Sequence, residues 1–453
     1  MQLTVAIDDL KVGMFVHLEL GWWAHPFALS NFEISSSDQI QTLRGLGLKQ
    51  LRWSPEKSRL DAPPETGDEP LADATTTSEA ATPRIAAAIE PPSAEPTVAA
   101  VQSLRIATEA TRSASPAARA LTAQRDAQRR CELQYLEAGA AWQEAQRQLP
   151  TAPEQARVIS EGLTRALLDK LMVDQEMCVR VLAGAAGEPN AAHAMNVTVI
   201  SLLMARVFGF GPDDMLDLGM GALLHDVGKH GLPERARHAD PRALPMDAQR
   251  YRSHVALGLV QGQRMSLSPG ALCVLAQHHE LADGNGFPNG LVQDNIVLAG
   301  RIVALVNRYD NLCNPPQAAN GLTPHEALSL IFAQSRGQFD ATMLNAFIRM
   351  MGVYPPGSVV QLTDDRFASV VSVNSSRPLK PRVLVCDPQV PPEVALLLNL
   401  DGQADLGIRR SLKPGQLPAA ARDYLSPSAR TVYFFEPVSA APAAGAEHQA
   451  LAA

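Results

Sequence analysis

The chain contains the stretch His278-His279-Glu280-Leu281-Ala282-Asp283-Gly284-Asn285-Gly286-Phe287-Pro288, which indicates its fold more clearly than any other segment. Two adjacent histidines are followed by acidic residues and then by a glycine-rich turn, which an aromatic residue and a proline close. Neighbouring side chains on a helix point about 100° apart, so a His-His pair at a helix end suits a cluster of metal ions better than a single ion. The alternative from this stretch alone is a polar helix end ahead of a loop.

A second segment, Leu223-Leu224-His225-Asp226-Val227-Gly228-Lys229, lies upstream. Its apolar run ends in a His-Asp pair, which would be costly in a core unless the two side chains pair or bind a metal. His193 and His254 lie in other predicted helices, and each taken alone is ordinary, His193 being most simply a core histidine. Their co-occurrence with the two segments supplies five imidazoles and one carboxylate, a donor set that suits Fe, Mn or Zn better than Mg or Ca.

Asp226 lies between the two histidine-rich parts of this set, so it is the natural bridge between two metals. Two metals about 3.5–4 Å apart can clamp a phosphate for in-line displacement. Lys229 follows one helical turn after His225 and could offer a positive charge to a phosphate oxygen, although a solvated helix-end lysine is also common. Together the segments predict a metal-dependent phosphohydrolase.

Composition limits the remaining possibilities. The chain has 453 residues, which predicts two or three domains, and a net charge of −8, which disfavours nucleic acid and acidic membrane surfaces as partners. Its five cysteines are scattered, and we interpret them as reduced residues of a cytoplasmic protein. We expect no membrane span and no secretion leader, because no apolar run is long enough and Met1 is not followed by one.

The sequence pattern predicts a multidomain chain. Residues 1–56 alternate apolar and polar residues, which predicts a small, mainly β module with one short helix around Ser37 to Gly45. Residues 57–100 are rich in Pro, Ala, Thr, Ser and Glu and predict a disordered linker. Residues 101–152 predict a helical connector, broken near Ser115-Pro116, that could also form a homodimer.

The remaining sequence divides into three predicted parts. Residues 153–355 predict a helical domain, with helices at 191–208, 213–228, 247–264, 269–280, 295–312, 324–335 and 340–351. Residues 356–436 predict a β-containing C-terminal extension, and residues 437–453 a disordered tail.

The spacing of these motifs resembles that of the HD-GYP family, bacterial phosphodiesterases of cyclic di-GMP within the HD-domain metal phosphohydrolases. The resemblance covers about residues 155–352 and implies an all-α HD-type bundle with two divalent ions, iron or manganese. The small N-terminal module, with Leu10-Lys11-Val12-Gly13-Met14, resembles the domain often found ahead of this one. Phe287 replaces the tyrosine of the Gly-Tyr-Pro triplet that names the family, which keeps the ring and loses a hydroxyl.

The resemblance also implies roles for individual residues. Lys229 and Asp310, with Asp226, are expected to take part in catalysis, Lys229 by holding a phosphate. The expected metal ligands are His193, His225, Asp226, His254, His278, His279 and Asn307. The expected substrate-binding residues are Lys229, Asp283, Gly284, Gly286, Phe287 and Pro288.

Four positions depart from the family pattern. Asn307, in Val306-Asn307-Arg308-Tyr309-Asp310, stands where the family has an aspartate ligand, and an amide oxygen carries no net charge. Pro189 occupies the place of a glutamate that supports a third metal in some members, which predicts two metals rather than three. Leu281, and the segment that follows Asp310, lack arginines that are frequent in the family.

The leading hypothesis is therefore hydrolysis of cyclic di-GMP to linear pGpG, with GMP as a further product left open, in bacterial second-messenger signalling. The alternative, motivated by Asn307, is a catalytically impaired module that acts as a cyclic di-GMP sensor or binds signalling proteins at the Gly-Phe-Pro loop. An HD phosphohydrolase of another nucleotide ranks below both, and a nuclease is disfavoured by the acidic balance.

Overall fold

The computed structural model describes residues 3–18, 31–34, 36–58, 115–172, 176–182, 188–238, 244–334, 337–374 and 377–437. The chain forms two compact units, residues 1–17 with 32–119 and residues 18–31 with 120–453. The predicted linker 57–100, the first part of the predicted connector and the predicted tail lie almost entirely outside the described residues. No helix in the described part of the chain has the length and apolar content needed to cross a bilayer.

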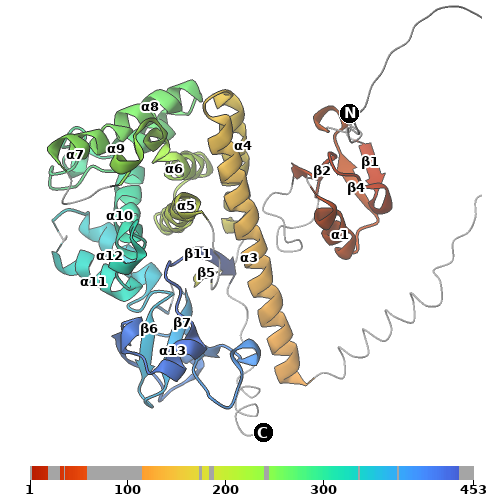
Figure 1. Cartoon of the computed structure of the whole chain (residues 1–453), viewed down its shortest axis with the longest axis vertical. Coiled ribbons are helices and arrows are strands. Elements are labelled where there is room, and N and C mark those ends of the chain that lie inside the picture. The colour runs from red at the N-terminus through yellow and green to blue at the C-terminus, as the bar shows by residue number, and fades with distance from the viewer. Residues whose placement is uncertain are drawn as a thin grey trace, which may run out of the picture. The chain divides into compact units, whose positions relative to one another are not determined.

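Within residues 3–57, the described part of the smaller unit forms a four-stranded sheet with one α-helix, as its alternating pattern predicts (Figure 1). Its elements are β1 (Leu3–Ala6), η1 (Ile7–Asp9), β2 (Phe15–His17), β3 (Asn31–Glu33), α1 (Ser37–Gly45), β4 (Gln50–Trp53) and η3 (Pro55–Lys57), and the strand order is β1-β4-β2-β3. Ser36 caps α1 by accepting a hydrogen bond from the backbone nitrogen of Gln39, which explains where the helix begins.

The larger unit is mainly helical (Figure 1). Its helices are α3 (Pro116–Gln148), α4 (Pro153–Leu171), α5 (Pro189–Val207), α6 (Pro212–Leu224), η4 (Val227–Gly231), η5 (Glu234–Ala236), α7 (Pro245–Arg252), α8 (His254–Arg264), α9 (Pro269–Gln277), η6 (Gln293–Asn295), α10 (Leu298–Cys313), η7 (Ala318–Asn320), α11 (Pro324–Gln334), α12 (Ala341–Met351), η8 (Pro392–Val394), η9 (Leu400–Gly402), η10 (Pro414–Gln416) and α13 (Ala419–Leu425). Seven of the described α-helices begin on a proline, whose fixed φ and missing N–H suit the first helical position.

The strands of the larger unit form one sheet. They are β5 (Met177–Val181), β6 (Val359–Leu362), β7 (Phe367–Asn374), β8 (Arg382–Val385), β9 (Leu398–Asn399), β10 (Ile408–Leu412) and β11 (Tyr433–Pro437). The order is β10-β6-β7-β5-β11, with β8 paired to β7 and β9, and each of these pairs is antiparallel.

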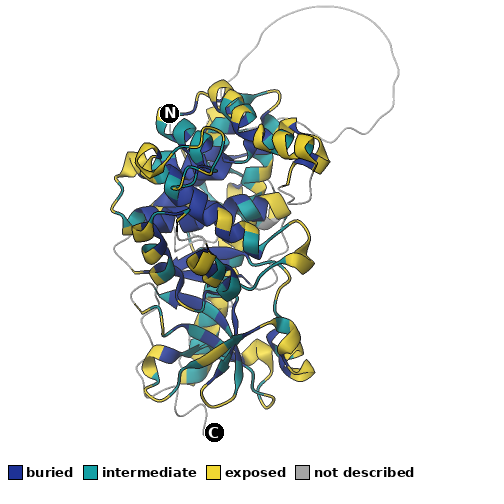
Figure 2. Cartoon of the chain, turned by 90° about the vertical axis from the view of Figure 1, so that its left-hand side faces the viewer, coloured by how far each residue is buried: buried dark blue, intermediate teal, exposed yellow. Residues whose placement is uncertain are grey.

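Helix α5 lies at the centre of the core. It is apolar on all sides, which predicts a buried helix, and it packs against α4, α6, α10, α12 and β11. Figure 2 shows the buried residues gathered in the interior of the helical part, with exposed residues on the outer helices and turns. Because α5 carries His193, the first predicted ligand is held by the best-packed element of the fold.

The structure joins parts that the sequence pattern separates. Strand β5 interrupts the stretch predicted to be helical throughout, and it pairs with β7 and β11 from the predicted C-terminal extension. Helix α3, predicted as a connector, contributes Cys131, Tyr135 and Ala138 to the same hydrophobic core as α5. The all-α expectation therefore holds for the central bundle, while the sheet behind it is built from strands on either side of that bundle in the sequence.

Candidate metal centre

Five histidines and Asp226 meet at one place in the larger unit. His193 lies on α5, His225 and Asp226 directly follow α6, His254 begins α8, and His278 and His279 directly follow α9. Five of these six residues thus stand at helix ends, and the packing of α9 against α6 and α8, and of η4 against α8, brings these ends together. His225, His254 and His278 are buried, with side chains cut off from solvent.

The six residues form two groups that share Asp226. One group is His193, His225 and Asp226, and the other is Asp226, His254, His278 and His279; within each group the possible ligand atoms lie within 4.8 Å of one another. Asp226 Oδ2 lies 3.5 Å from His193 Nε2 and 3.4 Å from His225 Nε2, whereas Asp226 Oδ1 lies 3.6 Å from His254 Nε2. The two carboxylate oxygens therefore face different groups, which is the arrangement of a bridging ligand.

Hydrogen bonds on the far side of the rings orient the histidines. His225 Nδ1 lies 2.7 Å from Ala222 O, His254 Nδ1 2.5 Å from Tyr251 O, and His278 Nδ1 2.8 Å from Leu275 O. A backbone carbonyl can only accept, so each Nδ1 carries the proton and each Nε2 presents a lone pair.

Two of these lone pairs face each other, since His254 Nε2 lies 3.1 Å from His278 Nε2. The Nε2 of His225 faces His193 Nε2 at 3.1 Å. The fixed tautomers of His254 and His278 leave no proton between their two nitrogens, so a cation is the natural partner of both. Asp226 Oδ1 is buried and finds no hydrogen-bond partner among the described residues, which also fits a position reserved for a metal. The donor set and its geometry fit two divalent ions.

The two ligand groups differ in the pKa values of their histidines, because burial and nearby charges act differently on each. Burial lowers the pKa of His254 to about 4, and it holds the pKa values of His278 and His279 well below the usual value, so these rings are neutral donors. Burial opposes protonation of His193 too, but hydrogen bonds to Asp226 and Asp310 outweigh it and raise the pKa of His193 to about 9. A metal in the group of His193 must therefore displace a proton from that ring.

Asp226 is ionised. Burial opposes ionisation, but the neighbouring His225 and Lys229 outweigh it and hold the pKa of Asp226 well below its usual value. Lys229 Nζ lies 2.5 Å from Asp226 Oδ2 and 5.4 Å from the centre of the Tyr251 ring. The predicted phosphate-binding lysine thus lies beside the bridging carboxylate.

Gly228 allows η4 to approach α8. A Cβ at Gly228 would collide with the carbonyl oxygen of His254 and the backbone nitrogen of Gly258. The backbone of η4 therefore lies directly against the first turn of α8, and this contact places His254 opposite Asp226. The sequence analysis quoted Gly228 without recognising this role.

The predicted substrate loop is anchored to the metal centre. The Phe287 ring stacks on His279, with ring centres 4.4 Å apart, and the Phe287 nitrogen donates to His279 O at 3.1 Å. A Cβ at Gly286 would collide with the backbone of residues 279–281, so only glycine allows the loop to turn back this closely. Gly284 has a φ of +78°, a second position that favours glycine, and the Phe287–Pro288 peptide bond is cis.

Two carboxylates shape this loop. Glu280 is buried, and its carboxylate accepts hydrogen bonds from the backbone nitrogens of Asn289 at 2.7 Å and Leu291 at 2.9 Å. Asp283, predicted to bind substrate, accepts a hydrogen bond from the backbone nitrogen of Asn285 and caps the turn. The sequence analysis assigned no role to Glu280, although a buried glutamate directly after two ligands is a usable signal.

Asp310, expected among the catalytic residues, lies behind His193. Its Oδ2 lies 2.6 Å from His193 Nδ1, on the opposite side of the ring from His225, and Asp310 is fully buried. Its Oδ1 accepts hydrogen bonds from Asn196 Nδ2 at 2.7 Å and from Asn314 Nδ2 at 2.9 Å. This geometry makes Asp310 a positioning residue for His193. Backbone carbonyls orient His225, His254 and His278 in the same way.

Asn307 is buried on α10, one turn before Asp310. Its Oδ1 accepts a hydrogen bond from Asn311 Nδ2 at 2.6 Å. Pro189, another departure from the family pattern, is the first residue of α5, and the preceding Glu188 caps this helix by accepting a hydrogen bond from the backbone nitrogen of Ala191 at 2.8 Å. Neither residue is a member of the two ligand groups.

Tyr251 is a residue of the centre that the sequence analysis missed. Its hydroxyl lies 3.4 Å from His279 Nε2, and its ring meets those of His254 and Phe287 edge-on or tilted. Burial raises the pKa of Tyr251 strongly, so the phenol keeps its proton. Its position three residues before His254 was the available signal, because residues three apart on a helix share a face.

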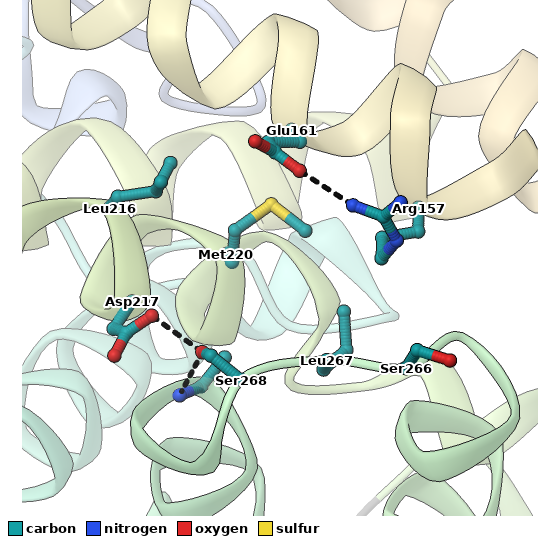
Figure 3. Close-up of a pocket in the computed structure, with 9 residues that line it drawn as sticks. Arg157, Glu161, Leu216, Asp217, Met220, Ser266, Leu267 and Ser268 are labelled. Atoms are coloured by element: carbon teal, nitrogen blue, oxygen red, sulfur yellow. Dashed lines mark hydrogen bonds and ion pairs between the residues drawn. The ribbon is translucent and has the colours of Figure 1, made fainter. Parts of the chain in front are cut away.

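A separate pocket of about 280 Å³ lies between α4, α6 and the turn before α9 (Figure 3). None of the metal-centre residues lines it. Its polar groups are paired with one another: Arg157 with Glu161 at 2.7 Å and Ser268 with Asp217 at 2.5 Å, over an apolar floor that includes Met220. With its charges already satisfied, this pocket offers no chemistry that competes with the metal centre.

Comparison with known proteins places this centre in a family. Residues 177–343 match the family model described as HD domain, and residues 2–161 match a domain of unknown function, DUF3391. Residues 177–343 form an HD domain. The match to DUF3391 covers the predicted N-terminal module and linker, all of α3 and the first part of α4. One family model thus covers a region that the sequence analysis divided into a module, a linker and a connector.

The HD domain is similar to curated bacterial proteins. A cyclic di-GMP phosphodiesterase of Pseudomonas aeruginosa is 29% identical over 47% of this chain and 52% of its own length. The cyclic di-GMP phosphodiesterase response regulator RpfG of Xanthomonas campestris is 31% identical over 35% of this chain and 43% of its own. A 3′3′-cGAMP-specific phosphodiesterase of Vibrio cholerae is 26% identical over 35% of this chain and 31% of its own length. The chain thus spans about half the length of these relatives or less, and the matches confirm the predicted resemblance.

Proposed function

We propose that this chain is a metal-dependent phosphodiesterase that hydrolyses cyclic di-GMP to linear pGpG, with further hydrolysis to GMP left open. The observation that carries the proposal is the carboxylate of Asp226, which faces two separate groups of histidine nitrogens with its two oxygens. Such a bridge is the mark of a two-metal site, and two-metal sites are widely used for phosphoester chemistry. The names of the relatives support the substrate class.

The ligand sets follow from the two groups. Two divalent ions, iron or manganese, would be held by His193, His225 and Asp226 on one side and by Asp226, His254, His278 and His279 on the other. When bound, such ions polarise a phosphoryl oxygen and allow water to act as a nucleophile at neutral pH.

Other residues of the chain position the substrate in this proposal. Lys229 Nζ, which lies 2.5 Å from Asp226 Oδ2, would donate to a phosphate oxygen, and its ammonium would stabilise the charge that develops on the phosphate. Phe287 and Pro288 form an apolar lip beside His279, and Gly284 and Gly286 let the backbone approach closely. Asp310 holds His193 in register.

A second candidate function is a cyclic di-GMP sensor that binds without turnover. It is favoured by Asn307, whose amide oxygen already accepts a hydrogen bond from Asn311 and carries no net charge to hold a divalent ion. In this reading the HD domain keeps its fold and signals through the Gly-Phe-Pro loop.

Turnover by the anaerobically purified full chain, loaded with Fe(II) or Mn(II), separates the two candidates. Cyclic di-GMP and 3′3′-cGAMP are assayed in parallel, with product read as pGpG, its analogue or mononucleotide. The variants are Asn307→Asp and the double variant His225→Ala/Asp226→Ala, which removes the bridge and serves as the inactive control.

The expected result is product release by the native chain and none by the double variant. Activity confined to Asn307→Asp would establish the sensor and end the phosphodiesterase proposal. Equal turnover by the native chain and the double variant would show that the activity arises elsewhere.

A further inference from the structure

The side chain of Arg252 lies beside the candidate metal centre. It is the last residue of α7, and its guanidinium carbon lies 5.3 Å from the centre of the Phe287 ring, within cation–π range. The Phe287 ring in turn stacks on His279 with centres 4.4 Å apart. The two distances together place the guanidinium within about 10 Å of a metal-ligand ring.

Arg252 differs from the other basic side chains of this region in being unpaired. Lys229 pairs with Asp226, Arg235 and Arg250 both pair with Asp247, and Arg237 donates to Leu232 O. Within the ranges that the structure describes, Arg252 has no acidic or hydrogen-bond partner, and it is exposed. An arginine held against an aromatic ring with its N–H groups uncommitted is prepared for an anion from solution.

The backbone around Arg252 is fixed by the metal centre itself. Tyr251, its neighbour, accepts the hydrogen bond from His254 Nδ1 at 2.5 Å through its carbonyl oxygen. Lys229 Nζ lies 5.4 Å from the centre of the Tyr251 ring, and the Tyr251 ring lies 6.2 Å from the Phe287 ring that carries Arg252. Lys229 and Arg252 therefore each lie over one of two neighbouring aromatic rings beside the candidate metal ligands.

We infer that Arg252 binds the second phosphodiester of a cyclic dinucleotide while the first lies at the metals, an inference that rests on the substrate class proposed above. A cyclic dinucleotide carries two phosphodiesters in one ring, so the phosphate that does not react stays close to the one that does. The guanidinium presents N–H donors in a planar fork that matches two phosphate oxygens. Its contact with Phe287 limits its freedom before the ligand arrives, which lowers the entropic cost of binding.

The inference makes Arg252 a determinant of specificity for cyclic dinucleotides over ligands with one phosphodiester. Loss of a hydrogen-bonded charge contact weakens binding by roughly 10- to 100-fold. The linear dinucleotide GpG carries the same two bases with one phosphodiester, so it tests the phosphate separately from the bases.

The experiment measures dissociation constants for the Mn(II)-loaded full chain with hydrolysis-resistant phosphorothioate analogues of cyclic di-GMP and GpG. The variants are Arg252→Ala, Arg252→Lys and the matched control Arg250→Ala, which removes a paired arginine from the same helix. Circular dichroism spectra establish that each variant is folded.

Arg252→Ala is expected to weaken binding of the cyclic analogue by roughly 10- to 100-fold and of the GpG analogue less than threefold, with Arg252→Lys intermediate and Arg250→Ala within twofold of native. Equal losses for both ligands would place Arg252 at a base and overturn the inference, as would a loss no larger than that of Arg250→Ala. A native chain that binds neither ligand would also overturn it. Because binding is read without turnover, an inactive chain that shows the expected pattern would refute the proposed hydrolysis and leave Arg252 in place.

Discussion

Gly228→Ala is the substitution that most directly tests how the fold builds the metal centre. The new Cβ would collide with two backbone atoms of α8, the carbonyl oxygen of His254 and the nitrogen of Gly258. Backbone atoms of a packed helix cannot rotate away, so η4 and α8 must separate. Overpacking of this kind costs about 1–3 kcal/mol of unfolding free energy, and rigid backbone neighbours favour the upper end, about 3 kcal/mol.

The same separation moves His254 away from Asp226. His254 Nε2 now lies 3.6 Å from Asp226 Oδ1, and metal sites tolerate displacements of only about 0.5 Å before affinity falls. We expect Gly228→Ala to lose about one of two equivalents of bound Mn(II), because the group of His254, His278 and His279 is disrupted while the group of His193 keeps its ligands. Equilibrium dialysis with elemental analysis measures the stoichiometry, and urea unfolding measures the stability.

Gly258→Ala is the matched control, because Gly258 faces Gly228 across the same contact. A Cβ at Gly258 would meet the Gly228 nitrogen at 3.6 Å and Val227 Cγ1 at 3.8 Å, which are ordinary van der Waals distances. In a helix interior the change from glycine to alanine favours folding by up to about 1 kcal/mol. If Gly228→Ala, like Gly258→Ala, kept native stability and native Mn(II) stoichiometry, the inference that a Cβ at position 228 forces η4 and α8 apart would be refuted.

Three further perturbations have defined outcomes. Lys170 is fully buried, and burial lowers its pKa to about 7 from the ordinary 10.5, so the folded chain releases a proton that the unfolded chain keeps between these values. The unfolding free energy of the native chain, relative to that of Lys170→Met, should therefore rise with pH above 7, by about 2 kcal/mol from pH 7 to pH 9. Urea unfolding of both proteins measures this difference, and a difference that does not change with pH would contradict the prediction. Tyr251→Phe removes the hydroxyl near His279 and should weaken Mn(II) binding roughly tenfold, and unchanged affinity by calorimetry would exclude that role. Asp310→Asn removes the negative charge behind His193, and the two amide groups that donate to Asp310 Oδ1 would turn the new NH2 group toward His193 Nδ1. Mn(II) binding should weaken roughly 10- to 100-fold, so a native binding isotherm would count against the positioning role of Asp310.

The candidate ligands could be picked out from the sequence, because the chemistry of metal binding restricts ligands to few residue types. Two adjacent histidines, a His-Asp pair at the end of an apolar run and two further histidines in predicted helices are local signals. The helices were predictable for a similar reason, since apolar periodicity and a proline at the first position are both read within one segment.

The orientation of the two Asp226 oxygens follows from the tertiary structure. The sequence position of Asp226 between two histidine-rich segments suggests a shared ligand, but only the packing of α6 and η4 against α5, α8 and α9 turns one oxygen toward each group. The close approach at Gly228 belongs to the same packing, and no local pattern marks it.

The hydrogen bonds that support Asp310 behind His193 join residues far apart in the sequence, so no sequence pattern could predict them. Asp310 receives a hydrogen bond from Asn196, and the same amide nitrogen of Asn196 also donates to Thr431 O, 235 residues along the chain. The Tyr433 nitrogen donates in return to Asn196 Oδ1 at 2.8 Å. The sequence determined which side chains can hold metal, since that depends on residue type and local spacing. The tertiary structure decided how they are held, since the pairing of β11 with β5 places Thr431 and Tyr433 beside Asn196, behind His193.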